Sequence, residues 1–183
     1  MSAVFKNGKY RLKPSFLEIE DNVPISDEMY AAMEKHSVVK FPYNYTHLLN
    51  RLPNNIRILH LGLVNLNIEM LANLPSSLER LILPRNVYGK NLEMLPYGIK
   101  LLYFDYVKFD YDTPTSDADF INMLPTLPPS VKLLIGGYPG CFIKIVNGEY
   151  DREIQCIYKD NGDEWSIGCD TLYSEDSFLN KYL

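Results

Sequence analysis

Apolar residues alternate with other residues in six short stretches of the chain. Each stretch contains a pair of residues separated by one other residue. The first residues of successive pairs lie 22, 20, 22, 21 and 32 residues apart. The six pairs are Leu17/Ile19, Val39/Phe41, Leu59/Leu61, Leu81/Leu83, Leu102/Phe104 and Leu134/Gly136. Alternation of this kind is typical of a strand that packs one face against a core. The pattern therefore predicts six short strands.

The middle strands share a lead-in that begins with Leu-Pro. The aligned stretches are Leu52-Pro53-x-x-Ile56-x-x-Leu59-x-Leu61, Leu74-Pro75-x-x-Leu78-x-x-Leu81-x-Leu83, Leu95-Pro96-x-x-Ile99-x-x-Leu102-x-Phe104 and Leu127-Pro128-x-x-Val131-x-x-Leu134. A repeat of 20 to 22 residues supplies one strand per unit, and such a unit cannot bury its apolar face without its neighbours. We expect the units to stack around a continuous core.

This pattern resembles the leucine-rich repeat consensus LxxLxLxxNxL. The Leu-Pro lead-in is similar to the short repeats of bacterial effector proteins and of the FNIP repeat proteins of amoebae and large DNA viruses, although the Phe-Asn-x-Pro-Ile stretch that names the latter does not occur. The resemblance implies an α/β solenoid with a parallel concave sheet of about six strands and a short irregular or helical convex side. It also implies a protein partner, in a host or ubiquitin-related pathway. Asn22, Asn44 and Asn86 occupy the consensus Asn position, where the amide satisfies backbone groups at the turn.

The two ends of the chain carry signals for caps. Asn7-Gly8 between apolar residues predicts a two-residue β-hairpin, so residues 1–15 are interpreted as an N-terminal cap before repeats over 16–140. Residues 141–183 contain two more Asn-Gly turns and a final apolar stripe that starts after Ser174, which predict a C-terminal cap of hairpins and a helix. Within the first repeat, Ser26 precedes two acids and begins a predicted helix that runs to about His36.

Composition limits the protein class. The chain has 183 residues and 46% hydrophobic residues, which fits one domain. No apolar run approaches the ~18 residues that a membrane helix needs, so we expect a cytoplasmic protein without a membrane partner. Cys141, Cys156 and Cys169 form no CxxC pair, which argues against a zinc site and a disulfide framework. In an oxidising setting, a single bridge between Cys156 and Cys169 is the alternative.

Charge and motifs argue against nucleic-acid binding and catalysis. The net charge is -5, and residues 105–183 hold six basic and fourteen acidic groups, a surface that repels phosphates. The three histidines, His36, His47 and His60, are scattered, and no hydrolase or phosphate-binding motif occurs, so we expect neither enzymatic activity nor a cofactor or metal. An insertion within 105–119 combines five acids with three aromatic residues and predicts either a binding loop or the start of a short helix.

The residues between the core leucines identify the candidate binding face. Strand side chains alternate, so these residues point together to the concave side in two rows. The first row is Phe16, Val38, Ile58, Arg80, Leu101 and Leu133, and the second is Glu18, Lys40, His60, Ile82, Tyr103 and Ile135. Six strands about 4.8 Å apart would make an exposed patch of about 400 Å², a size that marks an interface.

The sequence thus favours a non-enzymatic module that binds a protein through Ile58, His60, Arg80, Ile82, Leu101, Tyr103, Leu133 and Ile135. Ile82 and Tyr103 are the expected anchors, with Arg80 and His60 as polar contacts, because aromatic and arginine side chains dominate interface energetics. Two alternatives remain at this point. The face could pair with a second copy in a homodimer or larger structural assembly, or a segment of the same chain could fold over it.

Overall fold

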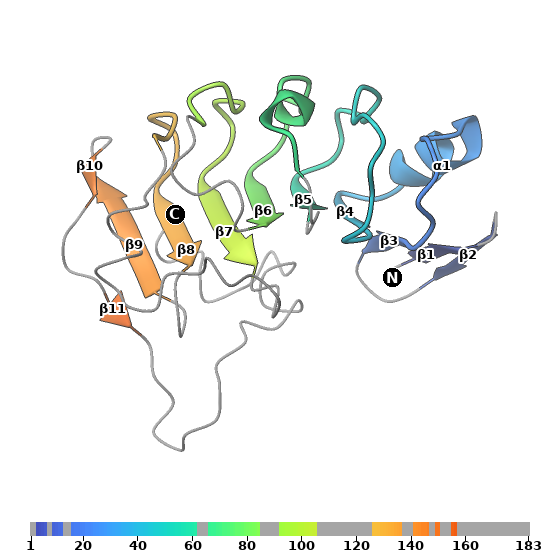
Figure 1. Cartoon of the computed structure of the whole chain (residues 1–183), viewed down its shortest axis with the longest axis horizontal. Helices are drawn as coiled ribbons and strands as arrows, with labels where there is room; N and C mark the ends of the chain where they lie inside the picture. The colour runs from blue at the N-terminus through green and yellow to red at the C-terminus, as the bar shows by residue number, and fades with distance from the viewer. Residues whose placement is uncertain are drawn as a thin grey trace, which may run out of the picture.

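The computed structural model describes the backbone of residues 3–6, 9–12, 16–61, 66–84, 92–105, 126–136, 141–146, 149–150 and 155–156. Its strands join into one sheet in the order β10-β9-β8-β7-β6-β5-β4-β3-β1-β2, with β11 beside β9. Figure 1 shows the strands side by side along the long axis of the molecule, with the connecting segments that are drawn as ribbon on one side of the sheet.

The six strands predicted from the alternation are confirmed. They are β3 (Leu17–Ile19), β4 (Val38–Phe41), β5 (Ile58–Leu61), β6 (Arg80–Pro84), β7 (Leu101–Asp105) and β8 (Leu133–Gly136). Neighbouring strands within this set, from β3 to β8, pair in parallel. The result is a parallel sheet with few helices among the described residues, which is consistent with the predicted α/β class.

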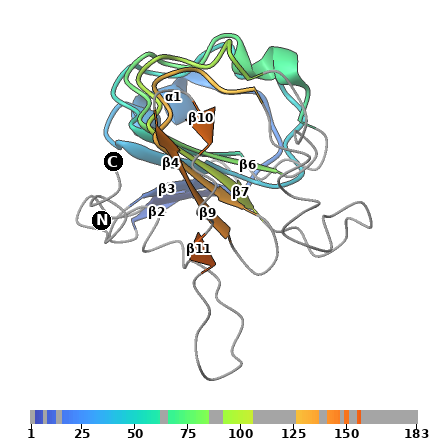
Figure 2. The same cartoon turned by 90° about the vertical axis from the view of Figure 1, so that its left-hand side faces the viewer.

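The segments that connect successive strands have similar paths. Looking along the row of strands, Figure 2 shows successive connections on nearly the same path above the sheet. One of them contains the helix α1 (Asp27–Met33), and another contains the 3₁₀ helix η1 (Ile68–Leu71). As predicted, Ser26 caps α1, since its Oγ accepts a hydrogen bond of 3.2 Å from the N–H of Met29.

The helix α1 ends three residues before the predicted end at His36. The Asn55 side chain of the next unit explains this end, because its Nδ2 donates to the carbonyl oxygens of Met33, Glu34 and His36 at 3.0, 3.1 and 2.9 Å. Carbonyls at a helix end have no partner within the helix and need one from outside. A residue 22 positions beyond Met33 therefore supplies the C-terminal cap.

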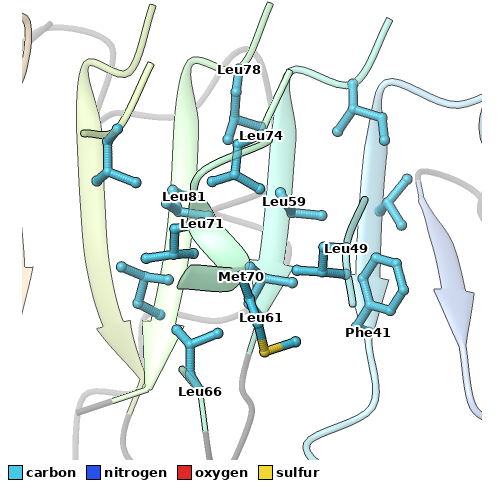
Figure 3. Close-up of a cluster of buried hydrophobic side chains, with 14 of the residues drawn as sticks. Phe41, Leu49, Leu59, Leu61, Leu66, Met70, Leu71, Leu74, Leu78 and Leu81 are labelled. Atoms are coloured by element: carbon cyan, nitrogen blue, oxygen red, sulfur yellow. The ribbon is translucent and has the colours of Figure 1, made fainter. Parts of the chain in front are cut away.

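The core lies between the sheet and its connections. Leu59, Leu81 and Leu102 are fully buried on the inner face of their strands. Figure 3 shows Leu59 and Leu81 together with Leu71 and Leu74 of the segment that connects their strands. Burial of each leucine side chain stabilises the fold by about 1.5–3 kcal/mol. The core positions that the repeat predicted are therefore confirmed.

The units that look alike in sequence also form the same turns. In each lead-in the proline carbonyl accepts a hydrogen bond from the N–H three residues later, which closes a β-turn. These bonds join Pro53 to Ile56, Pro75 to Leu78, Pro96 to Ile99 and Pro128 to Val131, at 3.4, 3.2, 3.1 and 3.1 Å. Shared carbonyls then link the units, since Arg57 O accepts from the N–H groups of both Glu79 and Arg80 at 2.8 and 3.0 Å.

One position of the turn packs directly on the preceding unit. Ser77 there donates a 2.8 Å hydrogen bond from Oγ to the carbonyl of Ile56. Gly98 occupies the same position one unit later, and a Cβ added to it would lie 2.6 Å from Ser76 O and 2.8 Å from Leu78 O. Real Cβ atoms do not approach backbone oxygens this closely, so the stacking of these turns requires glycine at residue 98.

The ends of the sheet agree with part of the cap prediction. Strands β1 (Ala3–Lys6) and β2 (Lys9–Leu12) form the expected antiparallel hairpin, and β1 pairs in parallel with β3. At the other end β9 (Cys141–Val146) runs antiparallel to β8 and also pairs with β10 (Glu149–Tyr150) and β11 (Gln155–Cys156).

Several sequence predictions lie outside the described residues. They are Asn86, most of the insertion over 105–119, the turn at Asn161-Gly162, Cys169 and the helix after Ser174. The strand register places Cys156 opposite Cys141. Across the described part of the chain, no helix has the length and apolar character needed to cross a membrane.

Candidate functional site

The residues predicted to form two rows on the concave face pair with one another across neighbouring strands in the structure. Along the first row Val38 pairs with Ile58, Ile58 with Arg80, Arg80 with Leu101 and Leu101 with Leu133. Along the second row Glu18 pairs with Lys40, Lys40 with His60, His60 with Ile82, Ile82 with Tyr103 and Tyr103 with Ile135. The register deduced from the repeat is therefore confirmed. It brings the candidate residues together on the face of the sheet that points away from the connecting segments, which we call the outer face.

The expectation that this outer face is exposed is wrong at its centre. Ile82 and Leu101 have no accessible surface, Ile58 is 3% exposed, and His60 and Arg80 are each 5% exposed. Apolar surface left in water costs about 25 cal/mol per Å², so a wide apolar strip is stable when the chain covers it. The alternative in which the chain itself closes this face agrees with the burial. The side chains of Leu133 and Ile135 lie outside the described residues.

His60 and Arg80 are the buried polar residues of this face. Each has an interaction partner within the chain. A buried guanidinium stays charged and therefore needs partners inside the protein. Both residues are better explained as part of the closed structure than as polar contacts that wait for a binding partner.

The margin of the outer face is more accessible. Lys40 Nζ lies 3.1 Å from Glu18 Oε1, and the two side chains are 29% and 19% exposed. Tyr103 is half-buried. The ion pair occupies the charged end of the second row. Of the two expected anchors, Ile82 and Tyr103, only Tyr103 has accessible surface.

Large exposed apolar side chains occur instead on the connecting segments. In the segments that follow β3 and β4 in the chain, they are Val23, Tyr43 and Leu48, with 43%, 66% and 66% of their surface exposed. Asn22 joins these two segments, because its Oδ1 accepts a 3.1 Å hydrogen bond from Thr46 N. The predicted role of Asn22 in satisfying a backbone group is thus confirmed, with the group supplied by the next unit.

A second exposed group surrounds the turn before β7. Tyr97 is 78% exposed, Met94 is 50% exposed, and Lys100 and Lys132 are also exposed. Lys132 N donates a 2.8 Å hydrogen bond to Lys100 O, which sets these two residues side by side on adjacent units. We call Met94, Tyr97, Lys100 and Lys132 the Tyr97 surface.

The charge just before strands β5 to β8 is partly compensated. Arg57 Nη2 lies 2.9 Å from Glu79 Oε2, and this hydrogen bond from Arg57 holds the pKa of the Glu79 carboxyl below its ordinary value. Both side chains are substantially exposed, so the pair stabilises the fold by at most about 1 kcal/mol. Glu79 therefore has a cation already, and the lysines of the Tyr97 surface extend the positive charge beyond it.

Sequence reasoning missed both exposed groups because it examined strand positions only. A signal was present in the turns. Met94 stands where the earlier units have Arg51 and Asn73, and Tyr97 stands where they have Asn54 and Ser76. An apolar residue at a position that is polar in both preceding units marks a surface that the repeat does not require.

The described residues contain no group of three or more His, Cys, Asp or Glu that could hold a metal ion. Comparison of the chain with protein-family models, curated proteins and solved structures found no match.

Proposed function

We propose that this chain is a leucine-rich repeat solenoid that acts as a non-enzymatic protein-binding module. The observation that carries the proposal is the fourfold recurrence of the Leu-Pro turn with the same backbone hydrogen bond. Repeat units of this kind present regular rows of side chains, and per-repeat variation on one edge is a common way to build a binding surface.

The partner contacts the exposed apolar side chains of the connecting segments rather than the centre of the outer face. Ile58, Ile82 and Leu101 are buried within the single chain, which supports contacts at the connecting segments over assembly of identical copies through that face. Tyr43, Leu48, Met94 and Tyr97 together offer the aromatic and long apolar groups that act as anchors in interfaces.

Affinity enrichment from the cells that make this protein tests the proposal. The bait is the full chain, compared with the variants Tyr43→Ser with Leu48→Asn, and Met94→Asn with Tyr97→Ser. All four residues are at least half exposed, so neither pair should lower the melting temperature. We expect a protein whose capture one pair abolishes and the other leaves intact. Captured proteins that respond to neither pair would contradict binding through these segments.

A further inference from the structure

The Tyr97 surface differs from its equivalents in the preceding units. Each turn has two central residues, and the first of them, which is exposed in all four turns, is Asn54, Ser76, Tyr97 or Pro129. A tyrosine ring with 78% of its surface exposed receives little stabilisation from the fold. The packing of the turn therefore gives no reason for an aromatic residue at this position.

The charge near Tyr97 is positive within an acidic chain. Residues 51–104 carry six basic and three acidic groups, whereas the whole chain has a net charge of -5. In the described part of the chain, the carboxylates near this surface are Glu79 and Glu93. Glu79 is bonded to Arg57, and Glu93 is exposed with an interaction of its own. Lys100 and Lys132 lie on adjacent units on the side of Glu79 away from Arg57.

We propose that the Tyr97 surface docks an acidic segment of a protein partner that also carries an apolar side chain. This inference rests on the proposed function and names the partner's chemistry. Tyr97 and Met94 supply the apolar contact, and the ammonium groups of Lys100 and Lys132 attract the flanking carboxylates. Complementary charge of this kind increases the association rate and selects the partner, while the aromatic contact supplies most of the affinity.

A nucleic acid fits this surface less well. Lysines next to an exposed aromatic ring can also contact phosphates and stack on a base. A long polyanion would, however, extend along a chain whose residues 105–183 have a charge of -8, from six basic and fourteen acidic groups. A short acidic peptide segment avoids this repulsion.

The test selects peptides from a random display library on the immobilised full chain. We expect the enriched peptides to combine Asp or Glu with a nearby aromatic or long aliphatic residue. Binding of one enriched peptide is then measured by fluorescence anisotropy. Met94→Asn with Tyr97→Ser, which installs the residues of the preceding unit, should weaken binding at least about tenfold. Lys100→Gln with Lys132→Gln should weaken it less and should remove most of its salt dependence.

The matched control is Tyr43→Ser with Leu48→Asn, which removes a tyrosine and an aliphatic residue elsewhere, both 66% exposed, and should leave binding unchanged. Peptides without an acidic bias, or no enriched peptide, would overturn the inference. If the control pair abolishes binding and the Met94/Tyr97 pair does not, the chain still binds protein, but through the other segment. A poly-dT oligonucleotide that binds and responds to the same variants would reassign the surface to nucleic acid.

Discussion

The inner face of the sheet and the centre of the outer face are both buried but differently composed. On the inner face, leucines of neighbouring strands meet the leucines of the connecting segments in one continuous cluster. On the outer face, Ile58, Ile82 and Leu101 surround His60 and Arg80, and none of these five belongs to that cluster. The repeat closes the inner face by itself, because each unit brings both the strand and the residues that cover it.

This difference changes the functional interpretation of the sheet. A repeat protein that used the outer face for binding would leave its apolar residues accessible, whereas here the centre of the face has 0–5% of its surface exposed. The accessible apolar residues lie on the connecting segments. We therefore regard the sheet as a scaffold with two buried sides, and the segments between its strands as the surface on which function depends.

The largest expected loss of stability comes from a charge introduced on the outer face. Ile82→Asp would bury a carboxylate at a site with no accessible surface, and we expect a loss of at least about 4 kcal/mol in the free energy of unfolding. Tyr43→Asp is the control on an exposed site and should change stability by less than about 0.5 kcal/mol. Denaturant titration of both variants decides the point. Similar small losses in the two variants would mean that the outer face is open to water.

Two neighbours in β6 compare the faces directly. Leu81 points to the inner face and Ile82 to the outer face, and both are fully buried. Leu81→Ala and Ile82→Ala should each cost about 2–5 kcal/mol, through lost burial and the cavity that remains. The midpoints of urea unfolding measure both losses. A loss below about 1 kcal/mol for Leu81→Ala alone would contradict the repeat core, and the same result for Ile82→Ala alone would contradict the second buried face.

The limit of sequence-based prediction follows from the same contrast. Alternation and the repeat period identify β3 to β8 and assign Leu81 and Ile82 to opposite faces, because both depend on local sequence. Whether Ile82 is covered depends on contacts with other parts of the chain, and the alternation within a strand does not report on such contacts. The register of Cys156 with Cys141 depends likewise on the strand order β8-β9-β11, which residue spacing does not determine. Tyr97 could have been found by comparing turns as well as strands.

A smaller effect is expected where the turns keep the units in register. Gly98→Ala would place a Cβ within 2.8 Å of two backbone oxygens, and the shift needed to relieve this should cost about 1–3 kcal/mol. At the same position one unit earlier, Ser77→Ala loses one hydrogen bond to Ile56 O and should cost about 1 kcal/mol. Thermal unfolding of the two variants compares them. If Gly98→Ala is as stable as the wild-type protein, the turns do not pack as described.

The smallest expected effect concerns a polar group inside the core. The Tyr45 ring packs against Phe41 with centroids 4.8 Å apart, and its buried hydroxyl finds no hydrogen-bond partner among the described residues. Tyr45→Phe should therefore be neutral or stabilising by up to about 1 kcal/mol. Burial raises the pKa of Tyr45 to about 12, so its neutral form is favoured in the folded protein. The wild-type protein should lose stability as the pH rises from 10 towards 12, and Tyr45→Phe should lose less; an equal alkaline loss would contradict the burial of this hydroxyl.

The central claim, that both faces of the sheet are closed within one chain, is tested most directly by methyl NMR with a water-soluble gadolinium chelate. With isoleucine and leucine methyl groups labelled, Ile56 and Ile99 report on the inner side and Leu48 on an exposed site. We predict that the methyl signals of Ile58 and Ile82 broaden as little as those of Ile56 and Ile99. Broadening of Ile58 and Ile82 to the level of Leu48 would contradict the claim and return the outer face to the list of binding surfaces.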